Sequence, residues 1–298
     1  MKLNENEPRS FLIIGGTEKA GTSSLFQYFS ASDQIIPSKV KETDYFRNPV
    51  VDINGYLKNF ERRSGKYYME ASPAYLGLAR KVGKKIKDTV GPENVHFVFI
   101  LRDPVDRVKS SFCFHKSKYY IPKSLSFEDY IKMCLSYSSG ELSLNETPFD
   151  NDWFLKVLDA GKYSKHVNYY RRLFPNVTLV DFANFKRSPK DTVKMICDLI
   201  DIDSRRYDNF NFHVTNKTTQ PKFEHFHRAA MKLNSNFEKF FLRNPNLKRL
   251  LVNFYFLLNK DDTSIDTQLS KETYELLKSY YTEDYVFLKK EFGSAQQS

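Results

Sequence analysis

The sequence predicts an α/β fold in which helices flank a central, mostly parallel sheet, giving three layers. Short apolar runs have the character of buried strands, and they lie at residues 9–16, 95–101 and 176–181. Patterns with helical spacing of apolar residues lie at residues 22–29, 79–90, 127–134, 152–173 and 189–200. Alternation of buried strands with amphipathic helices is typical of parallel sheets that are covered on both faces.

The first strand and helix are joined by a glycine-containing loop. The apolar run ends in Gly15 and Gly16, and the helix that follows places Leu25, Tyr28 and Phe29 at helix-compatible spacing. In α/β proteins such a loop is where anions bind, because the free N–H groups and the macrodipole at the helix N-terminus point at the ligand.

Prolines mark the borders of the other two strands. Gly91-Pro92 precedes the second strand, which ends before Pro104, where proline closes the strand and opens a new element. The third strand is entered from Pro175. We see no break in composition that would demand a second domain, so we expect one domain over residues 1–298, mostly helical over residues 223–293.

Composition limits the classes of protein that the chain can belong to. The formal net charge of +10 favours anionic partners without choosing among them, although a charged, solvated surface is the alternative explanation. Three cysteines with no close pair argue against a disulfide scaffold or a zinc site. Because residues 1–10 are polar and no apolar run is long enough to span a bilayer, we expect a cytoplasmic protein without a membrane span.

The loop between residues 15 and 24 has the residues needed to hold phosphate oxygens. Glycines let the backbone approach an anion closely, and the hydroxyls of Thr22, Ser23 and Ser24 follow directly. A nucleotide-kinase loop would require a lysine after Gly21, where this chain has Thr22, and the lysine instead stands at position 19. A glycine turn capped by serines, without a ligand, is the alternative.

The segment Lys19-Ala-Gly-Thr-Ser-Ser-Leu25 resembles the 5′-phosphosulfate loop of sulfotransferases that use 3′-phosphoadenosine 5′-phosphosulfate (PAPS). The resemblance implies a P-loop-like three-layer fold with a PAPS-binding core at about residues 9–220. It also implies that PAPS contacts a run of six residues, namely Lys19, Ala20, Gly21, Thr22, Ser23 and Ser24.

A second segment, residues 99–111, resembles the motif with which the same family holds the 3′-phosphate of the nucleotide. Arg102 and Ser110 occupy the two phosphate-binding positions, and the planar fork of arginine pairs well with phosphate oxygens. Asn216 and Lys217 fall where the family places a late loop over the nucleotide, although a polar surface loop is equally consistent with their sequence.

The catalytic residues are predicted by a resemblance to the heparan type of glycan sulfotransferase. Those enzymes carry a glutamate base in a pattern that Glu42 matches, whereas phenol-type members use histidine, which makes His115 the second candidate. Lys19 is the candidate that stabilises charge on the leaving oxygen. Ala71 stands where heparan enzymes often have lysine, which weakens that assignment, but neighbouring Glu70, Ser72 and Tyr75 could still line the acceptor cleft.

We therefore expect direct, metal-free transfer of a sulfuryl group from PAPS to a hydroxyl or amine, with a carbohydrate or another small or anionic molecule as acceptor and no nucleic-acid partner. The untargeted start of the chain fits a bacterial member of the family. Two alternatives remain at this point: a P-loop kinase or nucleotide hydrolase with an atypical loop, and a non-catalytic protein that binds polyanions. The sequence does not predict the oligomeric state.

Overall fold

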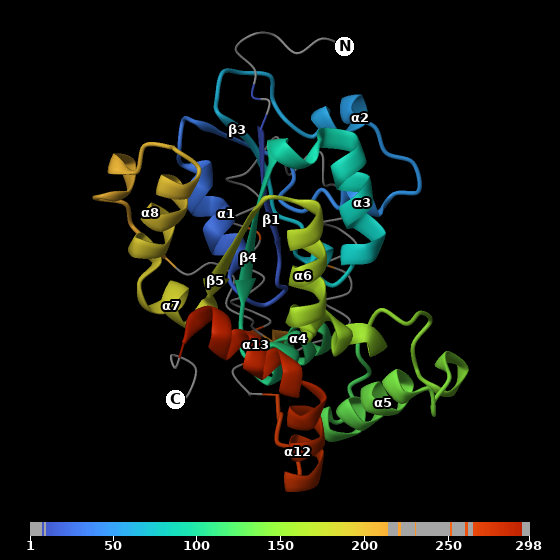
Figure 1. The fold of residues 1–298 in the computed structure, drawn as a ribbon. Helices are drawn as coiled ribbons and strands as arrows, with labels where there is room; N and C mark the ends of the chain where they lie inside the picture. The colour runs from blue at the N-terminus through green and yellow to red at the C-terminus, as the bar shows by residue number, and fades with distance from the viewer. Residues whose placement is uncertain are drawn as a thin grey trace.

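A computed structural model describes residues 10–213 and 265–293, together with positions 8, 220–221, 230, 251 and 260–261. Its centre is a five-stranded sheet in the order β2-β3-β1-β4-β5, and every neighbouring pair is parallel (Figure 1). The strands are β1 (Ser10–Gly16), β2 (Ile35–Pro37), β3 (Tyr67–Glu70), β4 (Val95–Leu101) and β5 (Asn176–Asp181). The predicted α/β fold with a parallel sheet is confirmed.

Helices cover both faces of this sheet. The described helices are α1 (Thr22–Ser30), α2 (Ile53–Leu57), α3 (Ala79–Val90), α4 (Pro104–Ser117), α5 (Phe127–Ser139), α6 (Tyr163–Leu173), α7 (Phe182–Arg187), α8 (Pro189–Leu199), α12 (Lys271–Tyr280) and α13 (Thr282–Phe292). Helices α1, α7 and α8 lie on one face, and α3 and α6 lie on the other (Figure 1). Helices α4, α5, α12 and α13 gather beyond the carboxyl ends of the strands, where α/β proteins bind their ligands (Figure 1).

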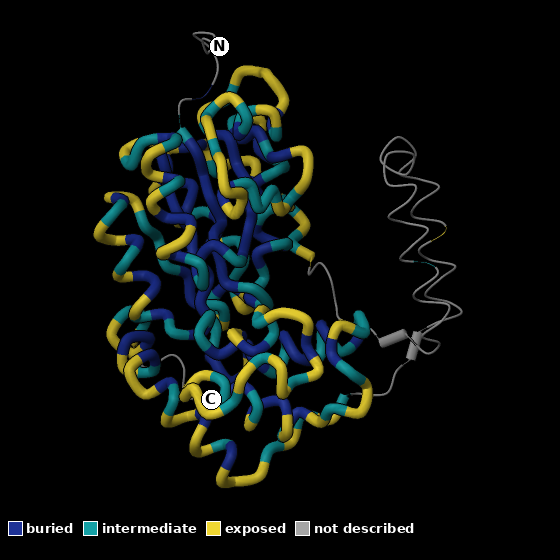
Figure 2. Tube along the Cα trace, turned by 90° about the vertical axis from the view of Figure 1, so that its right-hand side faces the viewer, coloured by how far each residue is buried: buried dark blue, intermediate teal, exposed yellow. Residues whose placement is uncertain are grey.

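Strand β4 shows why these strands read as continuous apolar runs in the sequence. All seven of its residues are buried, and alternate side chains enter two different cores. Phe97 and Phe99 pack with α3 and α6, whereas Val98 and Ile100 pack with α1 and α8. Burial of each such side chain contributes about 1.5–3 kcal/mol. The buried stretches of the tube in Figure 2 follow these central strands.

The structure corrects the predicted helix over residues 152–173. The α-helix begins only at Tyr163, and two short 3₁₀ turns, Leu155–Val157 and Asp159–Gly161, precede it. Gly161, the last residue before this helix boundary, lies so close to Tyr281 that a Cβ would lie 2.9 Å from its ring. The chain therefore packs against α12 and α13 there instead of continuing as a helix.

Part of the helical prediction for residues 223–293 can be compared with the structure. Residues 265–293 of this range form α12 and α13, as predicted. The short strand β7 (Lys260–Asp261) also lies in the range, and it pairs antiparallel with β6 (Gln220–Pro221), which precedes it. The predicted contacts Asn216 and Lys217 lie outside the described residues. Across the described segments, no helix combines the length and the apolar character required to cross a bilayer.

Candidate active site

A cleft of about 940 Å³ opens at the carboxyl ends of β1 and β4. It brings together nine residues that the sequence proposed for the site: Lys19, Gly21, Thr22, Ser23, Ser24, Glu42, Arg102, Ser110 and His115. Ala20 is the exception among the described candidates, because its side chain is buried in the core and its N–H donates to the carbonyl oxygen of Thr17 at 3.2 Å. Its contribution to the loop is therefore a tight turn.

The turn into α1 depends on a glycine. Gly21 is the N-cap residue of α1 and has a φ of 85°, in the left-handed region that favours glycine. A Cβ here would also lie 3.0 Å from the ring of Phe185. Because Gly21 has no side chain that could cap the helix, the positive end of the α1 dipole faces the cleft without a competing side-chain acceptor.

Lys19 holds its charge inside the cleft. Its Nζ lies 4.1 Å from the centroid of the Phe114 ring, and no carboxylate within the described ranges forms an ion pair with it. Burial lowers the pKa of Lys19; the negative charge of Glu18 opposes this shift and the positive charge of Arg102 adds to it. An amine in this position gains strongly from an anion beside it, because the anion would replace lost hydration.

Arg102 connects the two sequence motifs. It follows β4 directly, its Nη1 donates to the backbone oxygen of Lys19 at 3.1 Å, and its guanidinium lies 4.9 Å from the centroid of the Phe182 ring. Ser110 follows on α4, whose first turn is capped by the side chain of Asp103. The strand end and the helix thus hold one cation and one hydroxyl beside the loop that carries Lys19.

Two buried polar atoms of the cleft have no hydrogen-bond partner among the described residues: Thr17 Oγ1 and Arg107 Nε. Arg107 does support the fold, since its Nη2 donates to the backbone oxygen of Val157, but its side chain also lines the cleft. Leaving such groups unsatisfied costs about 1–3 kcal/mol each. Sequence reasoning assigned neither residue to the site.

Glu42 lies on a loop that is tied to the sheet on both sides. Its side chain is 52% exposed and accepts from Lys41 Nζ at 2.6 Å. The next residue, Thr43, donates its hydroxyl to the buried carboxylate of Glu70, and the N–H of Asp44 donates to Ser72 Oγ at 3.1 Å. The carboxylate of Glu42 is therefore solvated but held in position by its neighbours.

The prediction that Glu70, Ser72 and Tyr75 line the acceptor cleft is wrong. All three are fully buried, and none of them lines the cleft. Glu70 accepts from Tyr56 Oη at 2.8 Å and from Ser72 Oγ at 2.7 Å, so the group is an internal anchor. Burial raises the pKa of Glu70, and the hydroxyl donors oppose that shift.

His115 is less well placed as a base than its position in the sequence indicated. Its Nδ1 lies 3.2 Å from Ser111 Oγ, and its Nε2 lies 3.5 Å from a carboxylate oxygen of Glu18. Burial lowers the pKa of His115, which keeps the ring neutral near pH 7. Because both ring nitrogens face partners, the His115 ring positions the side chain of Glu18. Glu18 lines the cleft but was not predicted from the sequence, although it stands next to Lys19 in the loop motif.

The family model described as "Sulfotransferase domain" matches residues 9–244, which is more than half of the chain. This chain belongs to the sulfotransferase family. The resemblance of the two loop motifs is thereby confirmed at the level of the family, and sulfuryl transfer is favoured over the kinase and polyanion-binding alternatives.

Relatives of this sulfotransferase are distant. The chain is 32% identical over 110 residues to "Membrane-associated sulfotransferase kil1" of Dictyostelium discoideum, a match that covers 35% of this chain and 22% of that protein. A sulfotransferase from Alicyclobacillus acidocaldarius has a similar fold, with a TM-score of 0.55, 20% identity, and coverage of 77% of this chain and 92% of that chain. Mouse sulfotransferase SULT7A1, complexed with PAP, aligns with a TM-score of 0.42, 17% identity, and coverage of 66% of this chain and 61% of that chain.

The cleft of this sulfotransferase has two chemically different ends. Next to the phosphate loop its walls are aromatic, with Tyr28, Phe182, Phe185 and Phe212. Next to Glu42 they are charged, with Lys41, Asp44, Arg47, Lys156 and the exposed Trp153. The guanidinium of Arg47 lies 4.9 Å from the Trp153 ring centroid. Across the described residues, no group of three or more side chains could hold a metal ion.

Replacing Glu70 by alanine should lower the free energy of unfolding by about 3–5 kcal/mol, because it removes buried volume and leaves three hydroxyls without their acceptor. Glu70→Gln keeps the volume and should cost less. Since burial raises the pKa of Glu70 above its ordinary value of 4.5, the stability that Glu70 contributes is greatest in acid and falls as the pH rises through the raised pKa. Urea unfolding of both variants from pH 4 to 8 tests this; a wild-type advantage over Glu70→Gln that grows with pH would contradict it.

Proposed function

We propose that this sulfotransferase transfers a sulfuryl group from PAPS to a hydroxyl or amine of a carbohydrate by direct in-line displacement. The observation that carries the proposal is that one cleft contains both nucleotide motifs and a solvated carboxylate, Glu42. A donor held by the two motifs and an acceptor beside Glu42 would meet at Lys19. Metal-independent chemistry of this kind needs only positioning, a base and a cation beside the departing oxygen.

The donor set fits the groups that PAPS carries. Lys19 and the N-terminus of α1 suit the phosphosulfate end, and the fork of Arg102 with the hydroxyl of Ser110 suits the 3′-phosphate. Thr17 and Arg107 line the same cleft. When bound, PAPS would supply the sulfuryl group and a phosphate leaving group. The aromatic walls at this end suit the flat adenine ring.

The chain's own residues would divide the work between them. Lys19 donates to the oxygen on which negative charge develops, and its partial burial strengthens that interaction because water screens it less. Glu42 accepts the proton that the acceptor group loses. Arg102 fixes the register of the nucleotide through its bond to the backbone of Lys19, so that donor binding and the catalytic lysine are mechanically linked.

The charged end of the cleft favours a hydroxyl-rich acceptor. Trp153 is a partly exposed aromatic residue in contact with Arg47, and Glu42 and Asp44 supply further hydrogen-bonding groups to the same cleft. A sugar ring matches both features, since its C–H face can pack on an indole while its hydroxyls bond to charged side chains. A wholly apolar acceptor would make no hydrogen bonds with these charged groups.

The first test of this function is calorimetric titration with adenosine 3′,5′-bisphosphate, with ATP and magnesium as the comparison. We expect metal-independent binding of the bisphosphate, and Arg102→Ala should weaken it by at least about 100-fold through the loss of charged hydrogen bonds. Arg205→Ala is the matched control, because Arg205 is exposed and pairs with Asp203 away from the cleft. Preferential binding of ATP with magnesium would revive the kinase alternative.

A further inference from the structure

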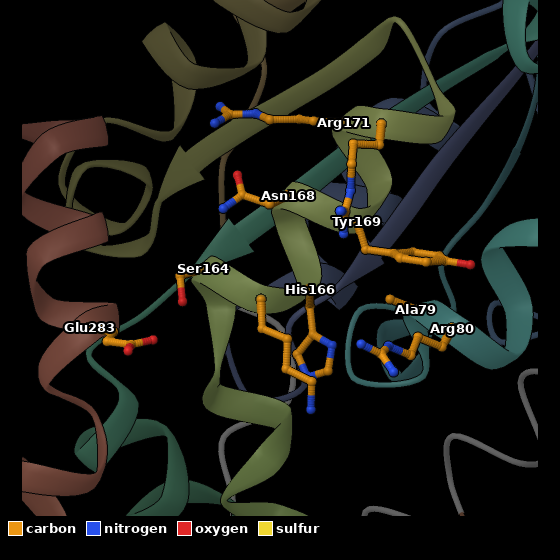
Figure 3. A pocket seen from close by; sticks show the side chains of 10 residues that line it. Ala79, Arg80, Ser164, His166, Asn168, Tyr169, Arg171 and Glu283 are labelled. Carbon is orange, nitrogen blue, oxygen red and sulfur yellow. The ribbon is translucent and has the colours of Figure 1, made fainter.

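A second hollow, about 680 Å³ in volume, lies outside the active-site cleft and shares no lining residue with it among the residues described. Three helices contribute to it: α6 runs through the middle, the start of α3 lies on one side and α13 on the other (Figure 3). Arg80 from α3 points across the hollow, and the ring of Tyr169 on α6 extends toward α3 (Figure 3). The side chains on the α3 side of the hollow are strongly basic.

The basic row on α3 consists of Arg80, Lys84 and Lys87, which stand at positions i, i+4 and i+7 and therefore share one face of the helix. This face borders α6, because Gly83 approaches the Tyr169 ring so closely that a Cβ would lie 3.1 Å from it. All three side chains are exposed, and none forms an ion pair or hydrogen bond with another described residue.

Helix α6 carries a parallel arrangement. Lys165, Tyr169 and Arg172 also stand at i, i+4 and i+7, so an aromatic ring separates two cations. Arg172 lies 5.9 Å from the Tyr169 ring centroid, and Lys165 pairs with Asp159 at 2.9 Å. We call the surface between the two rows, formed by these six residues of α3 and α6, the basic strip.

The acidic neighbours of the hollow do not neutralise the α3 row. Glu283 comes from α13 on the far side of α6 (Figure 3), and Glu291 is occupied by a bidentate pair with Arg171 at 2.6 and 2.8 Å. Arg80 also stands in the first turn of α3, where a cation opposes the helix dipole. Lys87 stands in the last turn of α3, where the dipole favours a cation, and Asp88 stands four residues after Lys84. The unfavourable part of the arrangement is therefore at the start of the helix, where Arg80 opposes the dipole and repels Lys84, and an external anion there would offset it.

We propose that the basic strip binds an anionic polysaccharide, a chain that bears carboxylate or sulfate groups. The α3 cations on one side and Arg172 on the other suit a linear chain whose acidic groups project to both sides, and the half-buried Tyr169 ring lies between them. A bilayer fits less well, since the strip offers no exposed aliphatic side chain for insertion among lipids. Binding of the polysaccharide to the basic strip does not depend on the proposed function. Only the inference that this polysaccharide is the acceptor of the sulfotransferase rests on the proposed function.

The test uses the full-length protein and fluorescein-labelled dextran sulfate, with anisotropy measured at two salt concentrations. A triple variant, Arg80→Glu, Lys84→Glu and Lys87→Glu, should weaken binding by at least about tenfold and make the salt dependence shallower, because fewer counterions are released. The matched control reverses three exposed charges elsewhere, at Arg205, Lys271 and Lys278, and should change affinity by less than about threefold through net charge alone. Thermal midpoints of unfolding, measured for the wild type and each variant, show whether a variant is still folded. A milder variant with alanine at Arg80, Lys84 and Lys87 separates lost binding from lost folding.

Equal losses in the two triple variants would show that net charge alone drives binding, and unchanged binding in the α3 variant would overturn the proposal outright. So would stronger binding to phosphatidylglycerol vesicles or to single-stranded RNA than to dextran sulfate at equal salt. The bisphosphate titration described above is run on the same variants. If bisphosphate binding fails in the wild type while dextran sulfate binding still depends on Arg80, the proposed function falls and the basic strip stands.

Discussion

Replacing Lys19 by alanine should lower the rate of sulfuryl transfer by about 100- to 1,000-fold, the usual effect of removing a donor that stabilises charge in the transition state. The structure supports a large effect because Lys19 is partly buried beside Phe114 and no other lysine lies in the phosphate loop. Nucleotide binding should weaken less than turnover, since Arg102 and Ser110 remain. Single-turnover kinetics with saturating PAPS separates the two effects.

The Lys19→Arg variant is the control for this prediction. The pH dependence of kcat/KM in the two proteins tests whether Lys19 is the group that titrates. Because burial lowers the pKa of Lys19, the wild-type value of kcat/KM should fall with rising pH at a lower pH than the ordinary lysine value of 10.5 would give. The guanidinium of the Lys19→Arg variant stays charged, so this fall should disappear whatever activity is left. If kcat/KM fell at the same high pH in the wild type and in the Lys19→Arg variant, the group that titrates would not be Lys19.

Replacing Glu42 by glutamine should lower kcat by about 100-fold or more while leaving bisphosphate binding unchanged, because the amide keeps the shape of the side chain but cannot accept a proton. The carboxylate is suited to this task by its solvated position in the cleft and by the anchored loop that carries it. Initial rates with a carbohydrate acceptor, paired with calorimetry, test both halves of the prediction.

Glu18→Gln is the matched control, since it removes another glutamate carboxylate that lines the same cleft. We expect this variant to retain activity within about tenfold, because Glu18 faces His115 and a lost contact of that kind is worth about 1 kcal/mol. Wild-type turnover by Glu42→Gln, together with a large loss in Glu18→Gln, would reassign proton removal to the pair of Glu18 and His115.

The cleft residues around the phosphate loop could be predicted to lie together because they belong to short contiguous motifs. The loop from Lys19 to Ser24 and the strand end at Arg102 are short motifs whose spacing is set by one turn and one strand, and both line the cleft except for Ala20. The strand at residues 95–101 and the helix at residues 79–90 were also predicted with their observed bounds, since each has a strong period and a proline or glycine at its border.

The acceptor end could not be predicted because it depends on residues far apart in the sequence. Trp153 contacts Arg47, and Gly161 packs against Tyr281; the residues of each pair are more than a hundred positions apart in the sequence. Strands β2 and β3 are three and four residues long, too short to show a period. The burial of Glu70 is likewise a consequence of hydroxyls from three different segments.

The strand order has a consequence for how this chain folds. Strand β1 carries the phosphate loop and lies between β3 and β4, so neither of its ladders can form until residues up to 70 and then 101 have been synthesised. The N–H of Thr17 also waits for β4, since its acceptor is the carbonyl oxygen of Ile100 at 2.9 Å. Such non-local pairing slows folding, because loop closure must precede the contacts that reward it. The loop at the start of the sequence therefore cannot become ordered before β4 has been synthesised, although it stands about eighty residues earlier in the chain.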